Sequence, residues 1–221
     1  MKKTLIIVDV QYDFYDPKGS LYVKGGEEII PEIKNLIETD GNIDQIIFTV
    51  DWHLPEDRSF SGNGGSWPFH CVQHTLGSTI HQDLINACIN LGYSSLDYVA
   101  ESGEGISPSG TYDVFKKGDS PYTEEYGAFV NYSYDPEKKF VCLTNMSDDS
   151  NAYIPDSNGI IICGLAGDYC VLKTLENLIR IPELEKYRFE VFSEGIRSID
   201  GGKKLSEFVI SNGLKYYGKG I

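Results

Sequence analysis

Thr4–Val10 reads TLIIVDV, a run of β-branched and aliphatic side chains interrupted near its end by Asp9. Two further runs, Gln45–Val50 (QIIFTV) and Gly159–Cys163 (GIIIC), have the same character. None of the three alternates between apolar and polar residues, which is typical of strands buried on both faces. The sequence therefore predicts a parallel sheet at the centre of the molecule.

Helices are predicted between and after these strands. Apolar residues recur at helical spacing in Glu27–Glu38, Ile80–Leu91 and Cys170–Arg180, and a last helix is expected near Gly202–Ser211. Further strands are expected at Leu96–Val99, Tyr112–Phe115 and Arg188–Phe192. The alternation of strands and helices predicts an α/β fold of three layers (α/β/α), with helices on both faces of a mostly parallel sheet.

The 221 residues contain no low-complexity linker and no internal repeat, so we expect a single domain over residues 1–221. Segments 101–110 and 131–158 are rich in Ser, Gly, Asn and Asp and are predicted to be loop insertions, although FVCLTN in the second could be a short strand. The second insertion is a candidate cover for a cleft or a contact surface of a homo-oligomer.

Composition excludes several classes of partner. The formal net charge of −14 repels phosphate backbones and anionic lipids, which argues against nucleic acid and membrane but not against a neutral small substrate. The first apolar run, Leu5–Val8, is too short for a signal peptide or a membrane span, so a cytoplasmic location is expected. Five cysteines without a C-x-x-C pair do not suggest a disulfide framework.

Candidate site residues interrupt or follow the predicted strands. Asp9 lies inside IIVDVQ, Asp51 and His53 follow IIFTV, and Cys170 follows IIICGLAGDY. In open parallel sheets, ligands bind beyond the carboxyl ends of the strands. We therefore expect a carboxylate, a D-x-H pair and a thiol to meet at one edge of the sheet.

Cys170 is a candidate nucleophile because it stands between the turn Gly164–Gly167 and a predicted helix. Amides at a helix N-terminus lower a thiol pKa and can also hold an oxyanion. Asp9 would then exchange the proton as a general base and acid. The alternatives are a buried structural cysteine and a buried salt bridge.

Asp51, His53 and His70 could bind zinc, iron or manganese and leave positions open for water or substrate. Ordinary polar residues of the core or surface are the alternative for both histidines. Lys117 follows the predicted strand YDVFK and precedes Gly118; by itself it suggests a solvated lysine, but a cation there could stabilise a thiolate and an oxyanion.

Three aromatic residues are each close in sequence to a proposed polar site residue. Core packing is the default interpretation of Phe14, Trp67 and Tyr126, but together they could sandwich a flat ring.

With these residues assembled, the chain resembles the nicotinamidase/pyrazinamidase branch of the isochorismatase-like cysteine hydrolases. The resemblance runs from Leu5 to about Ile179. Its landmarks are IIVDVQYDF, TVDWH, SWPFHCVQHTLG, FKKGDSPYTEEYGAF and CGLAGDYCV. It implies hydrolysis of nicotinamide, and of pyrazinamide as well, to the acid and ammonia through a thioester, in the salvage of nicotinamide toward NAD.

The resemblance also implies a role for each matched position. The catalytic triad would be Asp9, Lys117 and Cys170, beside one divalent metal ion, first of all zinc, on Asp51, His53 and His70. The oxyanion hole would be the amides of Ala166 and Cys170, with a cis bond between Leu165 and Ala166. The substrate contacts would be Phe14, Trp67, Tyr126 and Leu165, and the metal would take up the pyridine nitrogen.

Several positions depart from the family pattern. Asp57 stands where many members carry a further histidine, Leu54 replaces a proline, and Ser59 keeps a position that can hold metal-bound water. Asp57 and Ser59 are therefore candidate water-mediated ligands. Gly167 replaces the usual threonine and could loosen the turn that carries Cys170.

Two other functions are compatible with the residues. One is a related amidase that acts on a carbamoyl or ureido compound, which would need neither the metal nor the aromatic residues. The other is an inactive member that binds a ligand or a partner protein. The complete triad favours an enzyme, and the metal motif favours nicotinamide.

Overall fold

The computed structural model describes residues 2–96, 109–147, 150–155 and 159–218. Its centre is a seven-stranded sheet in the order β10-β9-β8-β1-β2-β4-β3, in which all neighbouring strands are parallel. The strands are β1 (Lys3–Val8), β2 (Ile43–Asp51), β3 (Ser94–Ser95), β4 (Thr111–Lys117), β8 (Gly159–Gly164), β9 (Phe189–Ile196) and β10 (Lys215–Tyr216). The predicted parallel sheet is thus confirmed, and its central strands β1 and β8 are buried along almost their whole length.

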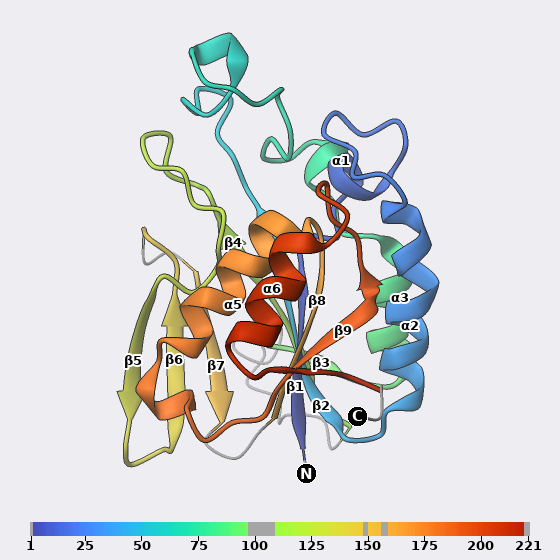
Figure 1. Cartoon of the computed structure of the whole chain (residues 1–221), viewed down its shortest axis with the longest axis vertical. Coiled ribbons are helices and arrows are strands. Elements are labelled where there is room, and N and C mark those ends of the chain that lie inside the picture. The colour runs from blue at the N-terminus through green and yellow to red at the C-terminus, as the bar shows by residue number, and fades with distance from the viewer. Residues whose placement is uncertain (1, 97–108, 148–149, 156–158, 219–221) are drawn as a thin grey trace.

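Helices flank this sheet, as the alternating pattern predicts. The longer ones are α2 (Ile29–Thr39), α3 (Gln82–Asn90), α5 (Leu172–Ile179) and α6 (Lys203–Ser211). Helices α2 and α3 lie together on one side, and α5 and α6 lie together on the other (Figure 1). A π-helix, η4 (Gly167–Val171), leads directly into α5, and short helical turns are α1 (Tyr12–Tyr15), η1 (Gly26–Glu28), η2 (Ser61–Asn63), η3 (Leu76–Ser78) and η5 (Pro182–Leu184).

The segment 131–158 differs from its prediction. It is not a loop insertion, because its described part forms a three-stranded antiparallel sheet of β5 (Asn131–Asp135), β6 (Phe140–Thr144) and β7 (Asn151–Pro155). Val141 and Leu143 of β6 are fully buried, and so are Ala152 and Ile154 of β7. These inward residues bind the small sheet to the core, beside β4.

Two other predictions concern residues that lie mostly outside the described part of the chain. Most of segment 101–110, and most of the strand predicted at Leu96–Val99, lie outside the described residues.

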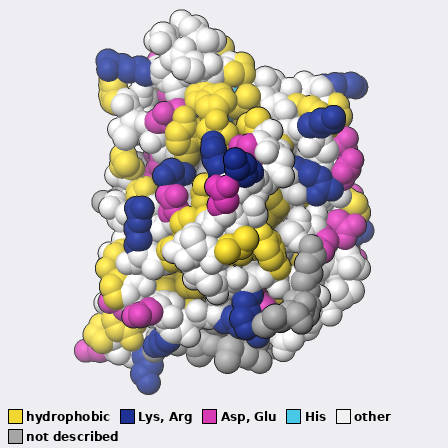
Figure 2. Space-filling model, in the orientation of Figure 1, with side chains coloured by type: hydrophobic (Ala, Val, Ile, Leu, Met, Phe, Trp, Pro, Cys, Tyr) yellow, Lys and Arg dark blue, Asp and Glu magenta, His cyan; other side chains and the backbone are white. Residues whose placement is uncertain are grey.

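The surface carries charged side chains of both signs. On the face that α5 and α6 cover, Lys and Arg side chains are interspersed with Asp and Glu (Figure 2). No helix in the described part of the chain is long and apolar enough to cross a membrane.

Candidate active site

Four adjacent strands end at the same edge of the sheet and bring the predicted polar residues together. Asp9 follows β1, Asp51 is the last residue of β2, and Lys117 is the last residue of β4. Asp51 and Lys117 are direct neighbours in the pairing of β2 with β4. Cys170 lies in η4, which follows β8 on the other side of β1. The expected meeting at the carboxyl ends is therefore what the structure shows.

Lys117 is the centre of this cluster and is completely buried, not solvated. Its Nζ lies 2.8 Å from Asp9 Oδ2 and donates to Asp51 Oδ1. Burial alone would lower the pKa of Lys117, but the carboxylates of Asp51 and Asp9 raise it well above the ordinary value. The side chain is therefore a permanent cation between two buried carboxylates.

Asp9 faces the cysteine as well as the lysine. Its Oδ1 accepts a hydrogen bond of 2.7 Å from Thr49 Oγ1, which leaves Oδ2 toward Lys117. A carboxylate oxygen of Asp9, one of Asp51 and the sulfur of Cys170 all lie within 4.8 Å of one another. Burial raises the pKa of Asp9 above its ordinary value, although Lys117 opposes the shift. A carboxyl group of this kind can both take and return a proton.

Cys170 is 94% buried, with a relative exposure of 6%. Burial raises the pKa of its thiol well above the ordinary value, although Lys117 opposes this shift. The thiol therefore needs a base to become a nucleophile. The bond between Leu165 and Ala166 is cis, and within the described residues the amide of Ala166 donates no hydrogen bond.

Gly167 lies in a closely packed turn before Cys170. Its amide donates a 2.8 Å hydrogen bond to the carbonyl of Arg197. A Cβ atom at this position would collide with Ser198 and would come within 2.7 Å of Ile196. The glycine thus permits close packing of η4 against the segment that follows β9.

Asp51, His53 and His70 form a set of possible metal ligands. One ligand atom of each lies within 4.8 Å of the others, and the Nε2 atoms of His53 and His70 are 3.7 and 3.9 Å from Asp51 Oδ2. His70 Nδ1 is 2.8 Å from the carbonyl of Pro68, and His53 Nδ1 is 2.8 Å from Asp57 Oδ2. These contacts occupy Nδ1 of each ring and leave both Nε2 atoms on the side of Asp51, so the three side chains fit a divalent metal ion once each Nε2 is deprotonated.

Asp57 contacts the candidate ligand His53. Besides the contact of Oδ2 with His53, its Oδ1 accepts a 2.8 Å hydrogen bond from the amide of Ser59. Burial would lower the pKa of His53, but hydrogen bonds to Asp51 and Asp57 raise it to about 9. A metal ion must therefore displace a proton from His53.

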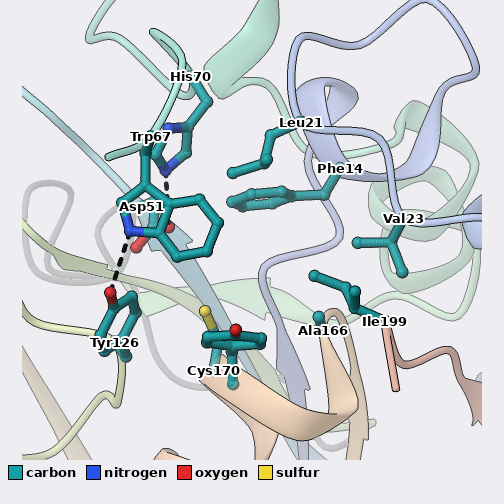
Figure 3. Close-up of a pocket in the computed structure, with 11 residues that line it drawn as sticks. Phe14, Leu21, Val23, Asp51, Trp67, His70, Tyr126, Ala166, Cys170 and Ile199 are labelled. Carbon is teal, nitrogen blue, oxygen red and sulfur yellow. Dashed lines mark hydrogen bonds and ion pairs between the residues drawn. The ribbon is translucent and has the colours of Figure 1, made fainter. Parts of the chain in front are cut away.

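A pocket opens above Cys170, whose sulfur points into it (Figure 3). Phe14, Trp67 and Tyr126 line this pocket, as expected for ring contacts. Leu165 does not line it, since its side chain is fully buried. The other lining residues are Leu21, Val23, Asp51, His70, Ala166, Tyr169, Cys170 and Ile199.

Sequence reasoning missed several residues that shape the site. Gln11 is fully buried and donates to the carbonyls of Asp51 and Ser78, while its Oε1 accepts from the amide of Asp51. Thr49 could have been found, because it stands two residues before Asp51 on the same strand and so faces the same side. Leu21 and Ile199 could not, because they are apolar loop residues without a pattern.

Several known proteins are similar to this chain in sequence or in fold. No protein-family model matches the chain. The nicotinamidase of Saccharomyces cerevisiae is 34% identical over 200 residues, which cover 78% of this chain and 79% of the relative. The structure of the yeast nicotinamidase bound to the inhibitor nicotinaldehyde aligns with a TM-score of 0.66 at 25% identity, over 98% of this chain and all of the other. The zinc complex of the Pyrococcus horikoshii pyrazinamidase has the same fold, with a TM-score of 0.64 at 22% identity over 98% of both chains.

Proposed function

The chain belongs to the nicotinamidase family, and we propose that it hydrolyses nicotinamide to nicotinate and ammonia with Cys170 as the nucleophile. The observation that carries this proposal is the buried cluster of Cys170, Asp9 and Lys117, whose cysteine lines an aromatic pocket, beside three side chains that could hold a metal ion. A carbamoyl or ureido substrate would use neither the aromatic residues nor the metal ligands.

The first half of the reaction forms an acyl-enzyme. Asp9 takes the proton of Cys170, and the thiolate attacks the amide carbon, so that a C–S bond forms as the carbonyl π bond opens. The amides of Ala166 and Cys170 donate to the resulting oxyanion, and the Lys117 cation stabilises the negative charge. Asp9 then gives its proton to the amide nitrogen, the C–N bond breaks, and ammonia leaves.

The second half returns the enzyme to its starting state. Asp9, again ionised, takes a proton from a water molecule that attacks the thioester carbon. The C–S bond breaks and Cys170 recovers its proton from Asp9. The product acid loses its remaining proton to solvent and is released as nicotinate. Burial raises the pKa of Asp9, and a higher pKa makes the carboxylate a stronger acceptor for the proton that it takes in each half of the reaction.

Zinc is the metal that we assign to Asp51, His53 and His70. When bound, it would supply a Lewis acid that takes the pyridine nitrogen as a ligand and so orients the ring. The zinc complex of the P. horikoshii pyrazinamidase supports this assignment. Phe14, Trp67 and Tyr126 would then pack on the ring of nicotinamide or pyrazinamide. Nicotinaldehyde, the inhibitor bound to the yeast relative, carries an electrophilic carbon where nicotinamide has its amide carbon.

We further place this reaction in the cytoplasm, in the salvage of nicotinamide toward NAD. The family membership supports the pathway, and the net charge of −14 agrees with a neutral small substrate.

Chromatography of the reaction products tests the proposal. Purified protein with zinc should convert nicotinamide into equal amounts of nicotinate and ammonia and should leave a ureido compound unchanged. Absence of nicotinate from zinc-loaded protein would contradict it.

A further inference from the structure

Glu124 makes two contacts that the proposed reaction does not use. It lies between β4 and β5, is exposed, and is not one of the residues that line the pocket above Cys170. Its Oε1 accepts a 2.9 Å hydrogen bond from Trp67 Nε1 and a second hydrogen bond from the hydroxyl of Tyr126. Trp67 Nε1 is also 3.0 Å from the Tyr126 oxygen, as the dashed line in Figure 3 shows.

The two donors belong to a wall of three aromatic rings. Trp67, Tyr126 and Tyr169 all line the pocket and meet edge to face. Their ring centroids are 6.3 Å apart for Trp67 and Tyr126, 5.7 Å for Trp67 and Tyr169, and 5.8 Å for Tyr126 and Tyr169. Edge-to-face packing is a favoured arrangement of aromatic rings, so the tilt of each ring depends on the other two.

Trp67 needs an anchor more than the other two rings do. All three rings are half-buried, but the neighbours of Trp67 in its own loop (Ser66, Pro68 and Phe69) are exposed, whereas the residues directly beside Tyr126 and Tyr169 are buried. Its Nε1 donates to Glu124 Oε1 and to the hydroxyl oxygen of Tyr126. One carboxylate oxygen therefore joins two chain segments that follow different strands, β2 and β4.

We propose that Glu124 is a positioning residue that holds Trp67 and Tyr126 ready to pack on the flat ring of the substrate. This inference rests on the proposed function for the identity of the ring. A side chain that is already ordered before the substrate binds loses no further conformational entropy on binding. The hydrogen bonds of Glu124 therefore lower KM for nicotinamide and leave kcat unchanged. The negative charge of Glu124 is not required, because both donors reach the same oxygen.

The kinetic test compares two substitutions. Glu124→Gln keeps a carbonyl oxygen that can accept both hydrogen bonds, whereas Glu124→Ala removes it. We expect Glu124→Ala to raise KM for nicotinamide about five- to tenfold, with kcat within about twofold of wild type, since about two side chains lose their order. Glu124→Gln should restore KM to within about twofold. Glu137→Ala, which removes another exposed carboxylate, is the matched control.

Fluorine NMR can detect the effect of Glu124 on the Trp67 ring in the absence of substrate. The chain has two tryptophans, so protein labelled with 5-fluorotryptophan gives two ¹⁹F resonances. Trp52 is the internal reference, because its ring packs against His74 and Lys116. Glu124→Ala should shift the Trp67 resonance, and Glu124→Gln should leave it near its wild-type position.

Three results would overturn the inference: an unmoved Trp67 resonance in Glu124→Ala, a Gln variant as impaired as the Ala variant, or loss of bound metal in Glu124→Gln. The last two would show that Glu124 acts through its charge. Failure of the proposed function is a separate result, because the wild-type protein would then not hydrolyse nicotinamide while the ¹⁹F comparison still reports on Glu124.

Discussion

Four ionisable side chains share one buried space, and the charge of each depends on the others. Lys117 lies between the carboxylates of Asp9 and Asp51, and the sulfur of Cys170 lies within 4.8 Å of an oxygen of each carboxylate. Burial alone would raise the pKa of Asp51, but Lys117, His53 and His70 lower it below the ordinary value. Asp51 therefore remains a carboxylate, with Oδ1 toward the lysine and Oδ2 toward the histidines.

Lys117→Met should be strongly destabilising, because it leaves two buried carboxylates without their cation. Breaking a buried ion pair in this way costs about 3–5 kcal/mol in the free energy of unfolding. Urea denaturation at neutral pH measures the difference. Lys24→Met, at an exposed position, is the control and should change little. Equal stability of the two variants would contradict the ion pairs of the buried cluster.

Cys170→Ala should fold normally and produce no nicotinate. The thiol carries no charge in the resting protein, so its loss removes the nucleophile without exposing a buried charge. Product chromatography measures activity, and circular dichroism checks the fold. Cys142→Ala, which alters a half-buried cysteine of β6, should remain active. Turnover by Cys170→Ala would rule out the thioester route.

His53→Ala should lose the metal, and Asp57→Ala should bind it less tightly. Asp57 orients His53 through a 2.8 Å contact, and losing such a partner weakens metal binding about 10- to 100-fold. Competition with a chelator measures both affinities, and Glu56→Ala is the control from the same loop. Wild-type affinity in Asp57→Ala would show that the contact with His53 is not used.

Among the elements, the end of α2 and the end of the chain are joined by one carboxylate. Asp40, directly after α2, accepts hydrogen bonds from the Tyr217 hydroxyl at 2.7 Å and from Lys3 Nζ at 3.2 Å. Burial would raise the pKa of Asp40, but the bonds from Tyr217, Asn42 and Lys3 outweigh it and lower the pKa to about 2. This contact holds the region after β10 against β1.

Stability should therefore depend on pH through Asp40. Because the pKa is lower in the folded state than the ordinary 3.8, its contribution is complete above about pH 4 and is lost as the pH falls toward 2. Asp40→Asn should lower the free energy of unfolding by about 1 kcal/mol at pH 7, and by much less near pH 2. Denaturation at both values checks this. An equal loss at pH 7 and pH 2 would show that ionisation is not the cause.

The elements that the sequence predicts well are those with long apolar runs. Residues 4–10, 45–50 and 159–163 coincide with β1, β2 and β8 to within about two residues, because a central strand must be apolar on both sides. Strand β7 was missed for the opposite reason. Only Ala152 and Ile154 point inward, and the exposed residues between and beside them resemble a loop. Strand β10 has two residues, too few to leave a pattern.

At the scale of the whole molecule, the meeting of the site residues could be predicted because topology alone causes it. Parallel strands β8, β1, β2 and β4 are neighbours and end at one edge, wherever their residues stand in the sequence. The orientation of loop side chains could not be predicted in this way. The contact of Asp57 with His53, the burial of Leu165 and the hydrogen bonds of Glu124 depend on distances between loops that no sequence pattern records.

The central claim is that the thiol and the metal site act together on nicotinamide. The most direct test is ammonia release from nicotinamide by the purified protein, before chelation, after chelation and after zinc is restored, with metal content determined on the same samples. We predict one zinc ion per chain, loss of ammonia release when the metal is removed, and recovery with zinc. Undiminished release from metal-free protein, or no release from zinc-loaded protein with Cys170 intact, would contradict the account.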